Sequence, residues 1–162
     1  MSNDQLLAYE TLLLAVFTAG GIIVAIWVYR RQCNAQVFIE YTKRYADIMN
    51  MFPVEGRKAR LDLSAEPPAR TDALSLAVLR YLNLCSEEFY LWKKGYLSRR
   101  VWRIWEAELR RTLASPLIMR EWASLREEFR SYPEFLDYVE KGQRQAPALQ
   151  TVQSAQVPPL QA

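Results

Sequence analysis

The pattern of hydrophobic positions changes sharply near residue 30. Residues 11–29, which begin at Thr11 and end at Tyr29, carry no charged side chain, and ten of these 19 residues are Leu, Ile, Val or Phe. A helix of that length rises about 28 Å, close to the ~30 Å hydrocarbon core of a bilayer. The ten side chains favour insertion by roughly 3 to 6 kcal/mol. A core helix of that length would have a polar face, so residues 11–29 are predicted to form one transmembrane helix.

The distribution of charge predicts how this helix is oriented. All 21 Lys and Arg residues lie at or after Arg30, and Arg30 and Arg31 directly follow the apolar stretch. Positive charge beside a span stays on the cytoplasmic side. We therefore expect a single-pass membrane protein, with its N-terminus outside and the remainder in the cytoplasm. The flanking charges are the reverse of those around a signal peptide, which predicts a retained anchor.

Beyond residue 32, apolar side chains recur every three or four residues, as on one face of a helix. Phe38, Tyr41, Tyr45 and Ile48 predict an amphipathic helix that continues the span and stops before Pro53. Residues 53–70 contain three prolines and a glycine, and they predict a loop that encloses a short turn around residues 60–63.

Ser, Thr, Pro and Gly residues mark the ends of four further helices. The expected first residues or caps are Thr71 or Asp72, Ser98, Ser115 followed by Pro116, and Ser131 followed by Pro133. The first of these helices is expected to end at Gly95 and the last near Gly142. No stretch alternates polar and apolar residues with period two, so no sheet is predicted.

The sequence therefore predicts an all-α protein, with a single N-terminal transmembrane helix followed by a compact bundle of four to five helices. The expected domains are a short outer segment (1–10), the span (11–29), the cytoplasmic bundle (30–142) and a disordered tail rich in Gln, Ala and Pro (143–162). The aromatic residues expected in the core are Tyr81, Phe89, Trp92, Trp102, Trp105, Trp122 and Phe129.

The composition excludes several kinds of active site. The chain has no His, only two Cys without a CxxC motif, and five Gly without a phosphate-binding pattern. No catalytic, metal-binding or cofactor-binding residue is therefore predicted, and the chain is expected not to be an enzyme. Adjacent acidic residues such as Glu87 and Glu88 point about 100° apart on a helix and cannot jointly hold a metal ion. They are expected to be partnered carboxylates on the surface, with entry of one into the bundle as the alternative.

Basic residues gather on one face of the helix that follows Ser98. This basic strip consists of Arg99, Arg100, Arg103, Arg110 and Arg111. A solvated helix face is the favoured interpretation. Contact with anionic lipid headgroups or with an acidic protein partner is the alternative, and contact with nucleic acid is the least favoured.

Small and apolar residues follow a 4-3 spacing through the span and beyond it. This candidate dimer seam consists of Leu14, Thr18, Gly21, Ala25, Val28, Ala35 and Ile39. Small residues let membrane helices approach closely, and a 3.5-residue period suits a left-handed parallel pair. The alternative is that Ala, Gly and Thr are simply common in membrane spans.

The bundle region also carries a set of aromatic and turn residues with recognisable spacing. The set comprises Arg80-Tyr81-Leu82-Asn83, Glu87-Glu88, Trp92 to Leu97, Trp102, Trp105, Pro116, Trp122, Phe129 and Pro133-x-Phe135. In these residues the chain resembles, over roughly residues 10–140, a family of small, mostly bacterial proteins of unknown function. The resemblance implies one N-terminal transmembrane helix in the bacterial inner (plasma) membrane and a short helical cytoplasmic domain, and it implies no catalytic residue or cofactor.

Two functions fit these patterns. The favoured one is a membrane-anchored, non-enzymatic interaction or regulatory module, with a protein partner of unknown identity, at the cytoplasmic face. The alternative is an effector in stress or phage defence that oligomerises through its span and perturbs the membrane. The span lacks polar, pore-lining residues, which argues against an aqueous channel.

Overall fold

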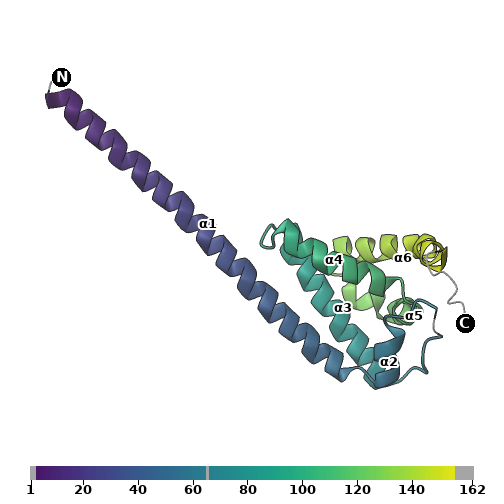
Figure 1. Cartoon of the computed structure of the whole chain (residues 1–162). Coiled ribbons are helices and arrows are strands. Elements are labelled where there is room, and N and C mark those ends of the chain that lie inside the picture. The colour runs from purple at the N-terminus through teal and green to yellow at the C-terminus, as the bar shows by residue number, and fades with distance from the viewer. Residues whose placement is uncertain (1–2, 65, 156–162) are drawn as a thin grey trace, which may run out of the picture. The chain divides into compact units, whose positions relative to one another are not determined.

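All regular secondary structure in the described part of the chain is helical. A computed structural model describes residues 3–64 and 66–155, which form six α-helices and one 3-10 helix (Figure 1). The elements are α1 (Asn3–Met51), α2 (Val54–Ala59), α3 (Asp72–Lys93), α4 (Arg99–Leu113), α5 (Pro116–Leu125), η1 (Arg126–Phe129) and α6 (Pro133–Ala155). The predicted all-α bundle is confirmed.

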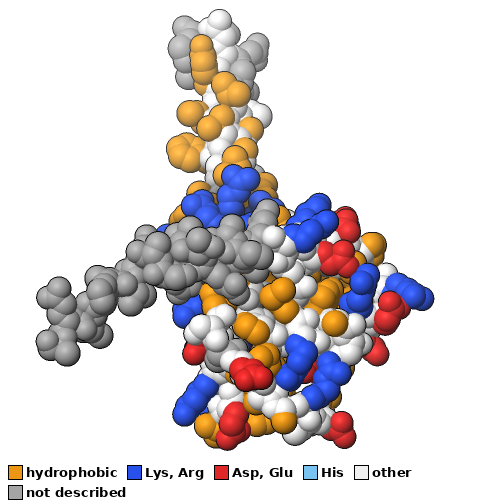
Figure 2. All heavy atoms as spheres, turned by 90° about the vertical axis from the view of Figure 1, so that its right-hand side faces the viewer, with side chains coloured by type: hydrophobic (Ala, Val, Ile, Leu, Met, Phe, Trp, Pro, Cys, Tyr) orange, Lys and Arg blue, Asp and Glu red, His pale blue; other side chains and the backbone are white. Residues whose placement is uncertain are grey.

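Contacts divide the chain into two compact units, one up to Ile39 and one from Glu40 onward. The first is part of α1, which is long and apolar enough to cross a membrane. Figure 2 shows hydrophobic side chains along this segment, whereas acidic and basic side chains are interspersed over the rest. We call the second, from Glu40 onward, the helical unit.

Local capping explains where the helices of the helical unit begin. The Thr71 hydroxyl accepts a hydrogen bond from the Leu74 amide at 3.2 Å, and Ser98 and Ser115 cap α4 and α5 in the same way. After α3 the chain turns at Gly95, whose φ of 74° lies in the left-handed region that favours glycine. These predicted helix starts and the predicted turn are confirmed.

Three predicted boundaries are wrong. Residues 54–59 form α2 rather than a loop, because Gly56 lets the backbone pack against Leu74, whose Cδ1 would lie 2.5 Å from an added Cβ. The helix after Ser115 ends at Leu125 and tightens into η1. The last helix passes Gly142 and continues to Ala155. Residues 156–162 of the predicted tail lie outside the described residues.

The core of the helical unit lies around α3 and α4, each of which packs against α5 and α6. Tyr81, Phe89, Trp102, Trp122 and Phe129 are buried, as the helical spacing predicts, whereas Trp92 and Trp105 are half-buried. Trp92 and Trp102 stack with ring centroids 4.7 Å apart, and Phe89 contacts both rings edge-on. This aromatic cluster joins α3 to α4, and aromatic pairs of this kind add about 0.5–1.5 kcal/mol each beyond burial.

Candidate functional site

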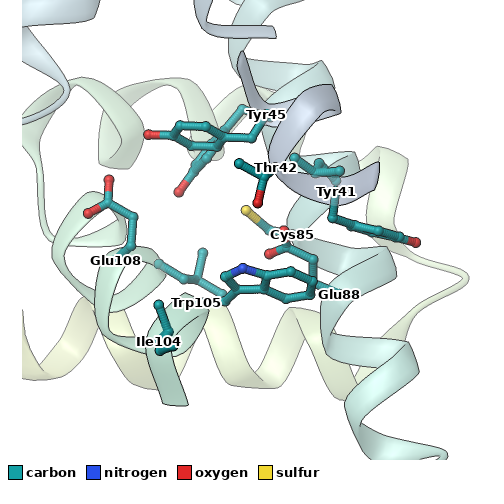
Figure 3. A pocket seen from close by; sticks show the side chains of 11 residues that line it. Tyr41, Thr42, Tyr45, Cys85, Glu88, Ile104, Trp105 and Glu108 are labelled. Atoms are coloured by element: carbon teal, nitrogen blue, oxygen red, sulfur yellow. The ribbon is translucent and has the colours of Figure 1, made fainter. Parts of the chain in front are cut away.

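A cavity of about 220 Å³ opens between the last turns of α1, the middle of α3 and α4 (Figure 3). Four aromatic residues form much of its wall, namely Tyr41, Tyr45, Tyr81 and Trp105. Two carboxyl groups, Glu88 and Glu108, also line it. An apolar cavity with a few polar groups is the usual form of a small-molecule site.

Helical spacing brings the lining residues to one place. Tyr41 and Tyr45 are four residues apart on α1, so both lie on the same side of that helix. Tyr81, Cys85 and Glu88 follow one face of α3 at intervals of four and three. In Figure 3 the Cys85 thiol and the Glu88 carboxyl point into the cavity, above the indole ring of Trp105.

Glu88 is the unusual group of the site. Only 7% of the residue is exposed, and no hydrogen-bond or ion-pair partner of its carboxyl occurs in the part of the chain that the structure describes. Burial, together with the neighbouring carboxylate of Glu87, raises the pKa of Glu88 to about 8. Near neutral pH this side chain therefore holds its proton in most molecules.

The adjacent Glu87 has the opposite environment. The Arg44 guanidinium donates to both of its carboxylate oxygens, at 2.6 and 3.0 Å, and the Tyr41 hydroxyl donates at 3.2 Å. The hydrogen bonds from Arg44 lower the pKa of Glu87 despite partial burial. The expectation of partnered surface carboxylates thus describes Glu87 and is wrong for Glu88, which enters the bundle because it shares the helical phase of Tyr81 and Cys85.

The other carboxyl group of the cavity, Glu108, is already neutralised. The buried Arg60 guanidinium donates to Glu108 at 2.8 Å, to the Tyr45 hydroxyl at 2.8 Å and to Thr112 at 3.2 Å. Its Cζ also lies 5.6 and 5.7 Å from the ring centroids of Tyr45 and Tyr81. The rings of Tyr45 and Tyr81, which line the cavity, therefore already form cation–π contacts with Arg60.

Cys85 contributes a buried thiol to the cavity. Burial, and then the nearby Glu88 carboxylate, raise the pKa of Cys85 well above its ordinary value. The thiol therefore stays protonated, whereas attack and metal binding need the thiolate. Within the described residues no group of three or more His, Cys, Asp or Glu is arranged to hold a metal ion.

The predicted basic strip lies on the exposed side of α4. All five of its arginines are exposed, and Arg110 bonds Glu106 of the same helix at 2.8 Å. Arg99, Arg100 and Arg103 form no ion pair within the part of the chain described by the structure. They are the basic residues of the strip that are open to a charged partner or to lipid.

The predicted dimer seam lies on exposed helix. Its seven residues are all exposed, and a Cβ added at Gly21 would meet no atom within 4 Å. The Thr18 hydroxyl donates to the Leu14 carbonyl at 2.8 Å, which satisfies this polar group within its own helix. The seam is thus open to a neighbouring helix, and dimerisation through it stays a prediction.

Sequence reasoning missed the cavity as a site. Taken singly, its lining residues are predicted to be core or surface positions, although the spacing of Tyr81, Cys85 and Glu88 indicates that they share one helix face. Comparison with protein-family models, with curated proteins and with solved structures finds no match to this chain. The resemblance to a family of small membrane proteins therefore stays a prediction.

Proposed function

We propose that the chain is a single-pass membrane protein whose helical unit acts as a non-enzymatic interaction or regulatory module at the cytoplasmic face. The observation that carries this proposal is the exposure of the uncharged segment 11–29. Its ten Leu, Ile, Val and Phe side chains are all exposed, from 39% for Val28 to 76% for Phe17. Soluble monomers rarely expose continuous apolar surface beyond a few hundred Å².

A bilayer accounts for this surface better than a protein partner alone. The segment is apolar on every side, as expected when lipid surrounds a helix, whereas docking on a partner requires one apolar face. Its end also has the features of a membrane interface. The Arg31 guanidinium lies 5.5 Å from the centroid of the Trp27 ring, and Arg and Trp are both favoured at headgroup depth. The two adjacent arginines, Arg30 and Arg31, favour a cytoplasmic helical unit.

The helical unit offers surfaces for binding. Its buried thiol is held protonated, its aromatic cavity carries one carboxyl group without a partner among the described residues, and Arg99, Arg100 and Arg103 are exposed on α4. The carboxyl group and the exposed arginines can each recognise a charged partner, whereas a protonated thiol is a poor nucleophile. These observations favour binding over catalysis.

The orientation is tested by protease protection in cells. The full chain carries an epitope after residue 162, and protease is added to intact spheroplasts and, as a control, to lysed ones. The epitope is expected to survive in intact spheroplasts and to be lost after lysis. Loss of the epitope in intact spheroplasts, while a cytoplasmic marker survives, would refute the cytoplasmic placement.

The interaction role is tested by crosslinking in cells. A photo-crosslinking residue replaces Arg99, Arg100 or Arg103 in turn, and the exposed Tyr132 on the connection before α6 serves as a matched position. We expect a discrete adduct with another protein from position 103 that is weaker or absent from position 132. Absence of any protein adduct from positions 99, 100 and 103 would contradict a partner at the basic strip.

A further inference from the structure

The cavity of the helical unit contains a buried carboxyl group, Glu88, without a charged partner among the described residues. We propose that it binds a small primary alkylammonium ion, with Glu88 as the counter-ion and with Trp105, Tyr45 and Tyr81 as its aromatic walls. The inference concerns the helical unit alone and goes beyond the proposed function, because it holds whether or not residues 11–29 enter a membrane.

The charges around the cavity favour a cation. Glu108 is neutralised by Arg60 at 2.8 Å, and Glu87, outside the cavity, by Arg44 at 2.6 Å. Glu88 has neither an ion pair nor a hydrogen bond within the described part of the chain, although it is buried and points into the cavity in Figure 3. An ionised carboxylate is stable in such a place when a positive charge accompanies it. A bound cation would supply that charge.

The walls favour an organic cation over a metal ion. The faces of Tyr45 and Tyr81 already accept the Arg60 guanidinium, and the Trp105 ring stacks on Tyr41 with centroids 5.5 Å apart. Aromatic rings attract cations electrostatically and also accept hydrocarbon. Only one carboxyl group there is unpaired, which is too few oxygen ligands for Ca²⁺ or Mg²⁺.

The volume of the cavity and the Glu88 carboxylate limit which organic cations can bind. A cavity of about 220 Å³ is smaller than the roughly 300–1,000 Å³ of pockets that enclose drug-sized ligands, so it suits a group of a few carbon atoms. The Glu88 carboxylate would accept hydrogen bonds from a primary ammonium group, and such charge-assisted bonds are about twice as strong as neutral ones. A quaternary ammonium ion has no N–H to donate.

The test is a calorimetric titration of the full chain in a non-ionic detergent at pH 8.5. Butylammonium chloride is compared with 1-butanol, which has nearly the same size and shape without the charge. Alkylammonium groups resemble the Lys side chain and stay protonated at this pH. We expect saturable binding of butylammonium with a dissociation constant on the order of 1 mM or below, and at least about 10-fold weaker binding of butanol. Absence of saturable binding, or equal binding of the alcohol, would overturn the proposal.

Two variants locate the binding site. Glu88→Gln keeps the size of the side chain and removes its charge, and it is expected to weaken butylammonium binding about 10- to 100-fold. Glu128→Gln makes the same change at an exposed position outside the cavity and is expected to bind like the parent. Circular dichroism checks that both variants are folded. A folded Glu88→Gln variant that retains full affinity would overturn the assignment of the counter-ion.

The pH dependence gives an independent readout on the unmodified chain. The titratable and charged groups that face Glu88 from the surrounding helices are Tyr41, Arg44, Tyr45, Arg60, Tyr81, Cys85, Glu87 and Glu108. Of these, Glu87 and Glu108 are ion-paired, and burial keeps Cys85 and Tyr81 protonated. Deprotonation of Glu88 is therefore expected to control binding, with affinity rising about 50-fold from pH 6 to pH 8. An affinity that does not change over this range would overturn the proposal.

Discussion

The buried Glu88 makes a quantitative prediction about stability. Burial and the neighbouring Glu87 carboxylate raise the pKa of Glu88 from its ordinary value of 4.5 to about 8 in the folded chain. Between these values the folded state binds a proton that the unfolded state has released, so the free energy of unfolding falls as the pH rises. Glu88→Gln removes this titration and keeps the shape of the side chain, so the variant should lack the decline.

The magnitude follows from the two pKa values. At 1.36 kcal/mol per pKa unit, the full effect is about 4 to 5 kcal/mol, reached above pH 8. Between pH 6 and pH 8.5, the free energy of unfolding of the variant should rise by about 2 to 3 kcal/mol relative to that of the parent. A change of this size is large compared with the 5–15 kcal/mol that typically separates folded from unfolded chains.

The assay is urea unfolding of the full chain in a non-ionic detergent, followed by near-ultraviolet circular dichroism. Four of the five Trp residues lie in the helical unit, so the signal reports mainly on its packing. Glu128→Gln is the matched control, since it removes a carboxylate from an exposed site. Equal slopes of unfolding free energy against pH for the parent and Glu88→Gln would refute the reasoning, because Glu88 would then titrate in the folded chain as it does in the unfolded chain.

Two further predictions concern the helical unit and the span. Arg60→Ala should lower the unfolding free energy by about 2–4 kcal/mol, since it leaves Glu108 and buried hydroxyls unpaired, whereas Arg110→Ala breaks an exposed pair and should lower it by less than about 1 kcal/mol. Equal urea midpoints of the two variants would contradict this difference. In a Cys33→Ser background, disulfide crosslinking through a cysteine at Ala35 should fall when Gly21→Leu fills the seam, and unchanged crosslinking would refute dimerisation along it.

The elements that the sequence predicted well depend on local interactions. Ser98 and Ser115 cap helices through bonds to amides three residues away, and Pro116 fits the first turn of a helix without its missing donor. Such signals are contained in a few neighbouring residues. The sequence does not predict α2, because the close approach of Gly56 to Leu74 is a contact between residues far apart in the chain.

The candidate site could not be predicted from the sequence, because contacts between helices form it. Glu88 looked like one half of a surface pair, and only the packing of α1 and α4 against α3 buries it and leaves Arg44 to its neighbour Glu87. Trp105 was placed on the core side of its helix, and in the folded chain it lines a cavity instead of filling the core. The spacing of residues along a helix indicates which face of that helix a side chain occupies. The shape of the neighbouring helices then decides whether the side chain meets a polar partner, a cavity or close packing.

The most direct test of membrane anchoring is extraction of cell membranes with alkaline carbonate, which releases peripheral proteins and leaves integral ones in the pellet. It compares the full chain with an Ile22→Lys, Ile23→Lys double variant. Each lysine near the middle of a span costs about 2.5–3.5 kcal/mol, so two of them offset the roughly 3 to 6 kcal/mol that favours insertion. The account predicts that the parent stays in the pellet and that the double variant is released. A parent chain found in the supernatant would contradict it.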